Sequence, residues 1–531
     1  MKKNFSRSFV FAPFAALAFA AAVGAVYAAD GRIEIDTARS LGEVSPFLFG
    51  QFIEYMGRDI EGGIYDAASP LSDARGIRQD VLAKAKELAP TMIRFPGGTF
   101  VKTFHWMDGV GPKEQRRASK NLIWGGVNTF GFGTCEFIDY CRAIGAEPVL
   151  VVNIATGTPD EAANWVDYCN GTNDTYYANL RRSHGYKEPF NVKFWALGNE
   201  EAAEPDAGRH QDPNDYVKDM WHFIKLMKLT DPSIELIADG ERGLPEWNKT
   251  VLRGLDGAID YISFHAYVDT WQNPYSLFER INGVERELAD MARQVKEHST
   301  FPVKSWKKWY RFPARTKPVK IALDEWGIWE KQDPPYGTTV VFEWRHALAT
   351  AWFLNAILRQ ADDLAMANWA QMVSILAPIM VNDETSIRQT VFYPLKEYRL
   401  NALGEAVGVR TSSPSVNGTL PALNAAATID RASGEIVLFV VNLAPARVAA
   451  AIAVDGGAAD CRIARSVLLT GESLTAANRL AAPERDVVTV VRTEPDAACS
   501  EISFPAESIQ ILRLVRTSSA NGARDRSLSH H

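Results

Sequence analysis

The sequence contains few cysteines and none of the common metal-binding or nucleotide-binding motifs. Five of its 531 residues are cysteine, no CxxC pair occurs, and no cysteine–histidine spacing matches a zinc site. A GxSxG elbow, an HExxH helix and a GxxxxGK[ST] loop are also missing, so the signatures of α/β-hydrolases, zinc proteases and P-loop enzymes are excluded. The nine histidines do not cluster at ligand spacing. We therefore expect no metal and no organic cofactor.

Basic runs are short, and the formal net charge is −7. Nucleic-acid-binding surfaces need clustered Lys and Arg, so we expect no nucleic-acid partner. Beyond the N-terminus no segment is long and apolar enough to span a membrane. The chain is too long for one core, which predicts a large domain and a smaller one.

The N-terminus has the pattern of a secretory signal peptide. Three positive charges lie within the first seven residues, and residues 9–26 are almost entirely apolar. Val26 and Ala28 supply small residues at the offsets that cleavage before Ala29 requires. Residues 1–28 are therefore predicted to be removed from an exported protein, periplasmic or secreted, with no membrane attachment after cleavage. The alternative is an uncleaved anchor.

Between about residues 44 and 400, apolar strand-like runs alternate with amphipathic helical stretches. The predicted strands are residues 47–54, 91–94, 148–153, 191–200, 234–239, 260–265, 319–325 and 364–371. The predicted helices include residues 80–88, 134–145, 159–168, 215–229 and 339–359. Eight such units predict a (β/α)8 TIM barrel over residues 46–400. An open doubly wound sheet is the rival fold, but it usually carries a glycine-rich turn after its first strand, and none is visible here.

After residue 401 the composition shifts to Ala, Val and Thr, with short alternating runs at residues 434–442 and 504–515. This pattern predicts a β-sandwich domain over residues 401–516, which a strand within residues 29–45 is expected to join. Residues 517–531 are polar and predicted to be disordered. In this exported chain a disulfide between Cys461 and Cys499 and two free thiols are both compatible with the sequence. Cys135 and Cys141, six apart on one predicted helix, are expected to be buried thiols.

Two predicted strands end on a glutamate, at Glu200 and Glu325. A TIM barrel places its active site at the C-terminal ends of its strands. A pair of carboxylates there is what glycoside hydrolysis needs, with roughly 5–5.5 Å between them in a retaining enzyme. Either residue alone could simply cap the following helix. The pair together indicates an acid and a nucleophile.

Four other predicted strands also end on polar residues. Glu54 ends the first strand, and Arg94 ends the second, shortly before Gly97 and Gly98. His265 and Tyr267 lie at the end of the sixth strand, and Gln371 ends the eighth. The glycines allow a backbone to approach a ligand closely. A hydrogen-bonding role is expected for His265 in preference to a metal-ligating one. Each residue alone is more often structural, and only their convergence on one rim favours a site.

These stretches resemble the α-L-arabinofuranosidases of glycoside hydrolase family 51 from about residue 47 to 400, with a weaker match in the C-terminal sandwich. The stretches that carry the resemblance include Phe49-Gly-Gln-Phe-Ile-Glu54, Arg94-Phe-Pro-Gly-Gly98, His105-Trp106, Leu197-Gly-Asn-Glu200, Tyr261-Ile-Ser263, Asp324-Glu-Trp326 and Ala370-Gln371.

The resemblance implies a retaining mechanism on an arabinose-containing oligo- or polysaccharide, with Glu200 as general acid/base and Glu325 as nucleophile. A homo-oligomer is the default that it implies. By the same resemblance, Glu54, Asn199 and Gln371 would bind the furanose hydroxyls. Arg94 would orient the nucleophile, and Tyr267 would donate a hydrogen bond near it. His265 and Thr99 would also contact the substrate, and Trp106 and Trp329 would form the walls of the pocket.

Two positions depart from the family pattern: Thr99 and Gly327 stand where the family usually has asparagine. Threonine keeps a hydroxyl but lacks the two donors and the reach of an amide. The exact sugar is therefore open. The alternatives are the same mechanism on a β-D-xyloside or a β-glucan, with endo action included, and a non-catalytic barrel that binds polysaccharide.

Overall fold

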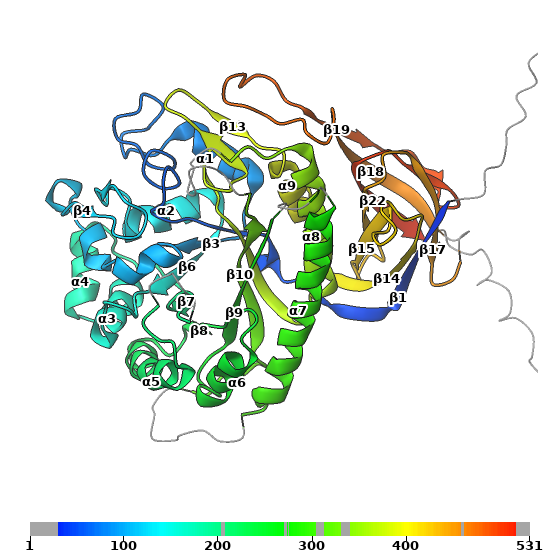
Figure 1. The fold of residues 1–531 in the computed structure, drawn as a ribbon. Helices are drawn as coiled ribbons and strands as arrows, with labels where there is room; N and C mark the ends of the chain where they lie inside the picture. Colours follow the sequence, from blue (N-terminus) through cyan, green and yellow to red (C-terminus); the bar gives the residue numbers. More distant parts are fainter. Residues whose placement is uncertain are drawn as a thin grey trace, which may run out of the picture.

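The computed structural model describes residues 30–202, 208–269, 273, 275–303, 313–330, 340–457 and 461–516. The predicted signal peptide and the predicted disordered tail lie outside these residues. Figure 1 shows an α/β barrel beside a sheet domain, with the blue strand β1 (Gly31–Glu43) lying in the sheet domain. No helix among the described residues has the length and apolar character needed to cross a membrane.

Eight parallel strands close into a barrel in the order β10-β11-β2-β3-β6-β7-β8-β9, which confirms the predicted TIM barrel. The strands are β2 (Gly50–Phe52), β3 (Met92–Phe95), β6 (Glu147–Val152), β7 (Phe194–Leu197), β8 (Glu235–Ala238), β9 (Tyr261–Val268), β10 (Lys320–Ile328) and β11 (Leu364–Ala370). Along β6, Val149 and Val151 belong to one apolar cluster with residues of the other strands, whereas Leu150 and Val152 belong to the large cluster that includes the helices. This alternation is what separates a barrel interior from its helical coat.

The helices of the barrel region are α1 (Gln79–Leu88), α2 (Thr134–Ile144), α3 (Pro159–Asn170), α4 (Tyr176–Ser183), α5 (Pro213–Thr230), α6 (Pro245–Gly254), α7 (Ser276–His298), α8 (Trp344–Arg359) and α9 (Phe392–Asn401). Several begin as their sequences dictate. Thr158 caps α3 by accepting a hydrogen bond from the Glu161 backbone N–H, and Pro159 occupies the first turn. Short 3-10 turns lie at η2 (Thr99–Thr103), η3 (Trp106–Gly109) and η4 (Lys113–Gln115).

The first predicted strand is shorter than expected. Residues 46–49 form the 3-10 helix η1 (Pro46–Phe49), and only Gly50–Phe52 is strand. The physical reason is local: the Ser45 side chain accepts a hydrogen bond from the Phe47 N–H, and Pro46 favours a helical first turn.

Helix α8 begins at Trp344, later than predicted, and is buried on nearly all sides. Its N-terminus is tied to the sheet domain, because Trp344 Nε1 donates to the Glu507 carbonyl at 2.7 Å. Near its C-terminus, Asn355 Nδ2 donates to Asn424 Oδ1 at 2.8 Å. Figure 1 shows α8 between the barrel strands and β15. The helix therefore joins the two parts of the molecule.

The C-terminal domain is a ten-stranded sheet in which β1 lies between β14 and β17. Its other strands are β14 (Glu405–Ser412), β15 (Leu423–Ile429), β16 (Ile436–Asn442), β17 (Val448–Val454), β18 (Cys461–Gly471), β19 (Val488–Thr493), β20 (Ala497–Ala498), β21 (Ile502–Phe504) and β22 (Ser508–Arg516). Residues of β18, next to one end of this order, and of β21, at the other end, share one apolar core, so the sheet curls over itself. Two small hairpins, β4–β5 (Ser119–Lys120 and Val127–Asn128) and β12–β13 (Ile379–Val381 and Ser386–Arg388), lie outside it.

The described cysteines form a disulfide in the sheet domain and are free thiols in the barrel domain. Cys461 on β18 is bonded to Cys499, 38 residues later, which settles the alternative that the sequence left open. Cys135, Cys141 and Cys169 are buried and free, as expected for the first two.

Candidate active site

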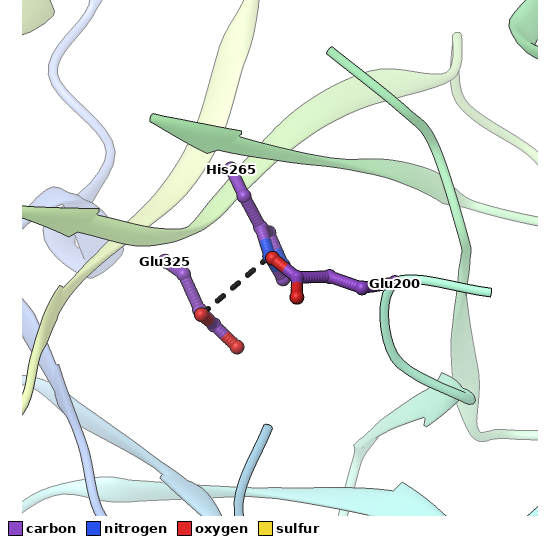
Figure 2. A group of neighbouring side chains, drawn as sticks. All are labelled: Glu200, His265 and Glu325. Atoms are coloured by element: carbon purple, nitrogen blue, oxygen red, sulfur yellow. Dashed lines mark hydrogen bonds and ion pairs between the residues drawn. The ribbon is translucent and has the colours of Figure 1, made fainter. Parts of the chain in front are cut away.

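Glu200 and Glu325 come together at the C-terminal rim of the barrel. Glu200 follows β7 by three residues, and Glu325 lies within β10. One carboxylate oxygen of each and a ring nitrogen of His265 all lie within 4.8 Å of one another, and Figure 2 shows the three side chains converging. The facing carboxylate oxygens of Glu200 and Glu325 are thus at most 4.8 Å apart, which is compatible with the separation of about 5–5.5 Å between the carboxyl groups of retaining glycosidases.

The backbone after β7 turns sharply, so that Glu200 faces the cavity at the barrel mouth and the buried Asn199 meets Arg94. Gly198 has φ +88° and Glu200 has φ +44°, both in the left-handed region. A Cβ at residue 198 would lie 2.4 Å from the Ile154 side chain, so only glycine fits there. The Glu200 and Glu201 backbone N–H groups each donate to the carboxylate of Asp239 at 3.0 Å.

Glu325 is held at both of its oxygens. Arg94 Nη1 donates to Oε1 at 2.5 Å, and the Tyr267 hydroxyl donates to Oε2 at 2.7 Å. Arg94 is 1 % exposed, and its Nη2 donates to Asn199 Oδ1 at 2.6 Å. One guanidinium thus fixes the residue before Glu200 relative to Glu325.

His265 lies between three carboxylates. Its Nδ1 is 2.7 Å from Glu200 Oε1 and 3.5 Å from Glu325 Oε2, and its Nε2 is 3.5 Å from Asp324 Oδ1. Burial opposes the charged form, but the neighbouring carboxylates, Glu325 first, raise the pKa of His265 well above its usual value. An imidazolium donates from both nitrogens and has no lone pair for a metal. The expected hydrogen-bonding role for His265 therefore fits better than a metal-ligating one.

Glu54 and Gln371 meet on the other side of the rim. Glu54 Oε1 accepts from the Phe100 N–H at 2.8 Å and from Trp124 Nε1 at 2.9 Å, and Oε2 accepts from Gln371 Nε2 at 2.9 Å. Complete burial raises the pKa of Glu54 to about 7, against the lowering effect of its hydrogen-bond donors. The Glu54 backbone N–H in turn donates to Asp59 at 2.7 Å.

These groups line a cavity of about 220 Å³. The lining residues are Phe52, Glu54, Met56, Gly98, Thr99, Trp124, Glu200, Tyr267, Glu325, Trp329, Gln371, Ile375 and Leu376. Thr99 and Trp329, both predicted at the site, are among them. Gly327 lies beneath the rim, where an added Cβ would be 3.1 Å from the Ala370 carbonyl oxygen.

The expectation that Trp106 walls the pocket is wrong. Trp106 is 2 % exposed, its Nε1 donates to the Glu161 carbonyl at 3.0 Å, and it stacks on Trp165 in the barrel's outer core. Trp124, from the loop between β4 and β5, lines the cavity instead. The only sequence signal for it is an aromatic residue before the pair Gly125 and Gly126, and such a signal is weak.

Sequence reasoning also missed two buried aspartates. Asp59 is fully buried and accepts from the Glu54 and Val373 backbone N–H groups at 2.7 and 3.1 Å. Asp239, 3 % exposed, does the same for Glu200 and Glu201. Asp239 was expected only as the last residue of a strand, because a backbone contact leaves no mark in the sequence.

The two glycines after Arg94 make room for the carboxylates. An added Cβ at Gly97, where φ is +151°, would lie 2.5 Å from Glu54 Cγ. At Gly98 it would lie 3.0 Å from Glu325 Oε1. The close approach expected of these glycines is therefore to the acids of the site.

Comparison with known proteins gives a consistent result. The family model described as "Alpha-L-arabinofuranosidase 1 domain" matches residues 84–284, and the one described as "Alpha-L-arabinofuranosidase C-terminal domain" matches residues 324–508. Alpha-L-arabinofuranosidase C of Emericella nidulans is 34 % identical over 511 residues, covering 91 % of this chain and 97 % of that protein.

Two further similarities extend the comparison. The protein of Halalkalibacterium halodurans named intracellular exo-alpha-(1->5)-L-arabinofuranosidase is 32 % identical over 429 residues, covering 77 % of this chain and 84 % of that protein. The solved structure of the thermostable GH51 alpha-L-arabinofuranosidase from Thermotoga petrophila superposes with a TM-score of 0.78 at 33 % identity. That superposition covers 91 % of this chain and 99 % of the other.

We expect Gly97→Ala to lower the free energy of unfolding by about 2–3 kcal/mol, because the new methyl group overlaps Glu54 in addition to straining the backbone. Urea denaturation measures the change. Gly434→Ala is the matched control: φ there is +74° and nothing lies within 4 Å of the added Cβ. The control meets only the backbone penalty of about 1 kcal/mol. Equal losses in the two variants would contradict the overlap with Glu54.

Proposed function

This chain belongs to glycoside hydrolase family 51, the α-L-arabinofuranosidases, and from that membership we propose that it releases non-reducing-end α-L-arabinofuranosyl residues by double displacement. The substrates would be arabinoxylan, arabinan or their oligosaccharides from plant cell walls. The observation that supports this mechanism is the pair of carboxylates, with one oxygen of Glu200 and one of Glu325 within 4.8 Å of each other. Arg94 and Tyr267 hold the two oxygens of Glu325.

In the first step Glu325 attacks the anomeric carbon. The bond from that carbon to a Glu325 oxygen forms, the bond to the leaving oxygen breaks, and Glu200 gives its proton to the leaving oxygen. Arg94 and Tyr267 each donate to one oxygen of Glu325, and together they fix its orientation.

In the second step Glu200, now ionised, takes a proton from water as the water oxygen attacks the anomeric carbon. The bond to Glu325 breaks, its carboxylate is restored, and two inversions give net retention. His265 contacts both glutamates and so remains near the negative charge as it moves from Glu325 to Glu200.

The sugar would occupy the cavity beside Glu54, Asn199 and Gln371. Among the described residues, Asn199 Nδ2 and Gln371 Oε1 are buried without a hydrogen-bond partner in the protein. Unpaired buried amide atoms are costly, and furanose hydroxyls would satisfy them. Tyr267 and Trp329 pack edge to face at 5.2 Å and, with Trp124, supply the apolar walls.

Export and assembly are also proposed. The charged and apolar pattern of residues 1–28 supports cleavage and export to the periplasm or beyond. N-terminal sequencing of the purified protein from its native host tests this, and an intact residue 1 on the protein would reject it. Oligomerisation rests only on the resemblance, and its test is the mass of the protein in solution.

Among the predictions that follow from the proposed function, the first concerns the two acids. We expect Glu325→Gln to lower kcat by on the order of 10³-fold or more, since no covalent bond forms. Glu200→Ala is expected to lower kcat/KM by on the order of 10²–10⁴-fold on oligosaccharides and far less on nitrophenyl glycosides, whose leaving groups need little protonation. Steady-state kinetics measure both effects. Near wild-type activity of Glu325→Gln would disprove the nucleophile, and equal losses for Glu200→Ala on both substrates would disprove the acid.

The second prediction concerns the sugar. On a panel of nitrophenyl glycosides we expect α-L-arabinofuranoside to exceed β-D-xyloside and β-D-glucoside in kcat/KM by on the order of 10²-fold or more, with Glu325→Gln as the blank. Thr99→Asn, which restores the usual family residue, is expected to lower KM without changing this order. Activity on a pyranoside alone would mean that Thr99 and Gly327 mark a changed specificity. Binding of polysaccharide without turnover would favour the non-catalytic alternative.

The third prediction concerns pH. The neighbouring carboxylates, Glu325 first, raise the pKa of His265 well above its usual value, so we expect the ring to stay charged through neutral pH. An NMR pH titration of the histidine ring signals measures this, and the His265 signal should stay that of the charged ring between about pH 6 and 8. His184 is the control, because burial lowers its pKa and its ring should lose its charge below that range. A His265 signal that titrates together with that of His184 would contradict the imidazolium.

A further inference from the structure

The Asp239 carboxylate binds the main chain that carries Glu200. Its Oδ1 accepts from the Glu200 N–H and its Oδ2 from the Glu201 N–H, both at 3.0 Å. Asp239 is 3 % exposed and directly follows β8. Within the described residues it does not line the cavity, so it acts on the site only through the peptide groups of its neighbours.

Asp239 is itself held from two sides. Its backbone N–H donates to the Tyr216 hydroxyl at 2.8 Å, and that hydroxyl donates to the Leu197 carbonyl at 2.9 Å. Trp247 Nε1 donates to the Asp239 carbonyl at 3.1 Å. Tyr216 lies on α5 and Trp247 on α6, so two helices fix Asp239 against the end of β7.

Glu200 needs such support because of its backbone. At φ +44° it occupies the left-handed region, which a residue with a Cβ adopts only when its surroundings impose it. Lys102 Nζ donates to the Glu200 carbonyl at 3.1 Å. The main chain of Glu200 is therefore held at its N–H by Asp239 and at its C=O by Lys102.

We propose that Asp239 is a positioning residue for the acid step: by binding the Glu200 and Glu201 amides, it sets where Glu200 delivers its proton. This inference rests on the proposed role of Glu200 as acid/base. Proton transfer depends steeply on position, and a displacement of about 1 Å costs on the order of 10²-fold in rate. The dependence is greatest for poor leaving groups, because those need the proton in the transition state.

A merely structural role and a positioning role differ in one readout. A loosened barrel rim lowers kcat/KM by the same factor for every aglycone, since the sugar is the same in each. A displaced acid lowers it most for poor leaving groups. The slope of log kcat/KM against the pKa of the leaving group separates the two cases.

The test variant is Asp239→Asn, which keeps the size of the side chain but turns an N–H donor toward one of the two amides. It is assayed on aryl α-L-arabinofuranosides of graded leaving ability and on an arabino-oligosaccharide. We expect a loss of on the order of 10²-fold on the oligosaccharide and less than about 3-fold on the dinitrophenyl glycoside.

Asp59→Asn is the matched control. Asp59 binds two backbone amides in the same way, those of Glu54 and Val373, but it supports the sugar-binding side of the cavity. We expect its variant to lose activity by one factor across the whole series. Tyr216→Phe is the second variant, because it removes the hydroxyl that holds Asp239 and so reproduces the leaving-group dependence at smaller amplitude even if Asp239→Asn fails to fold.

The outcomes are distinct. A steeper slope for Asp239→Asn or Tyr216→Phe, with an unchanged slope for Asp59→Asn, supports the inference. A uniform loss for Asp239→Asn, or no loss, overturns it, provided that Glu200→Ala steepens the slope. If Glu200→Ala leaves the slope unchanged, then the acid/base assignment fails and the inference falls with it.

Discussion

The buried guanidinium of Arg94 is the interaction on which the rest of the site depends. It joins β3 to Glu325 on β10 and to Asn199 after β7, and it lies 3.4 Å from Asp324. A charge that is 1 % exposed is tolerable only when it is paired and hydrogen-bonded. Removing it would leave the Glu325 and Asp324 carboxylates buried without their main counter-charge, which costs far more than the pair contributes. Arg94 therefore fixes Glu325 relative to Asn199, the residue before Glu200.

The charges around Arg94 are arranged so that ionisation states differ between neighbours. Burial raises the pKa of Asp324, but Arg94 and His265 outweigh it and hold that pKa below its usual value. The same carboxylates raise the pKa of His265, whereas Glu54, where burial dominates, has its pKa raised to about 7. Two cations thus lie beside Glu325, whereas the groups that donate to Glu54, on Phe100, Trp124 and Gln371, are uncharged. This separation is what a reaction needs when a carboxylate attacks a sugar held by its hydroxyls.

The barrel and the placement of Glu200 and Glu325 at its rim were predictable from the sequence alone, because long apolar runs that end on an acid are visible without tertiary information. The first strand was predicted too long because the effect of Ser45 and the following proline, a capped 3-10 turn, was not recognised. Trp106 was placed in the pocket and Trp124 was missed, since nothing local distinguishes a tryptophan stacked in the core from one on a rim loop. The contact of Asp239 with Glu200 could not be predicted for a different reason. Its partners are backbone amides, which every residue other than proline has, so no residue type in the sequence indicates the contact.

Asp239 and Asp59 together show how the rim is made rigid without large side-chain networks. Each is a buried carboxylate that accepts from two backbone N–H groups, one of them belonging to a residue that faces the sugar cavity. Burial raises the pKa of both carboxyl groups well above the ordinary value, and hydrogen bonds from the backbone N–H groups act in the opposite direction. The backbone positions of Glu200 and Glu54 are then set by hydrogen bonds to these two buried carboxyl groups. A site built in this way can vary at Thr99, which lines the cavity, while the backbone positions of Glu200 and Glu54 are kept.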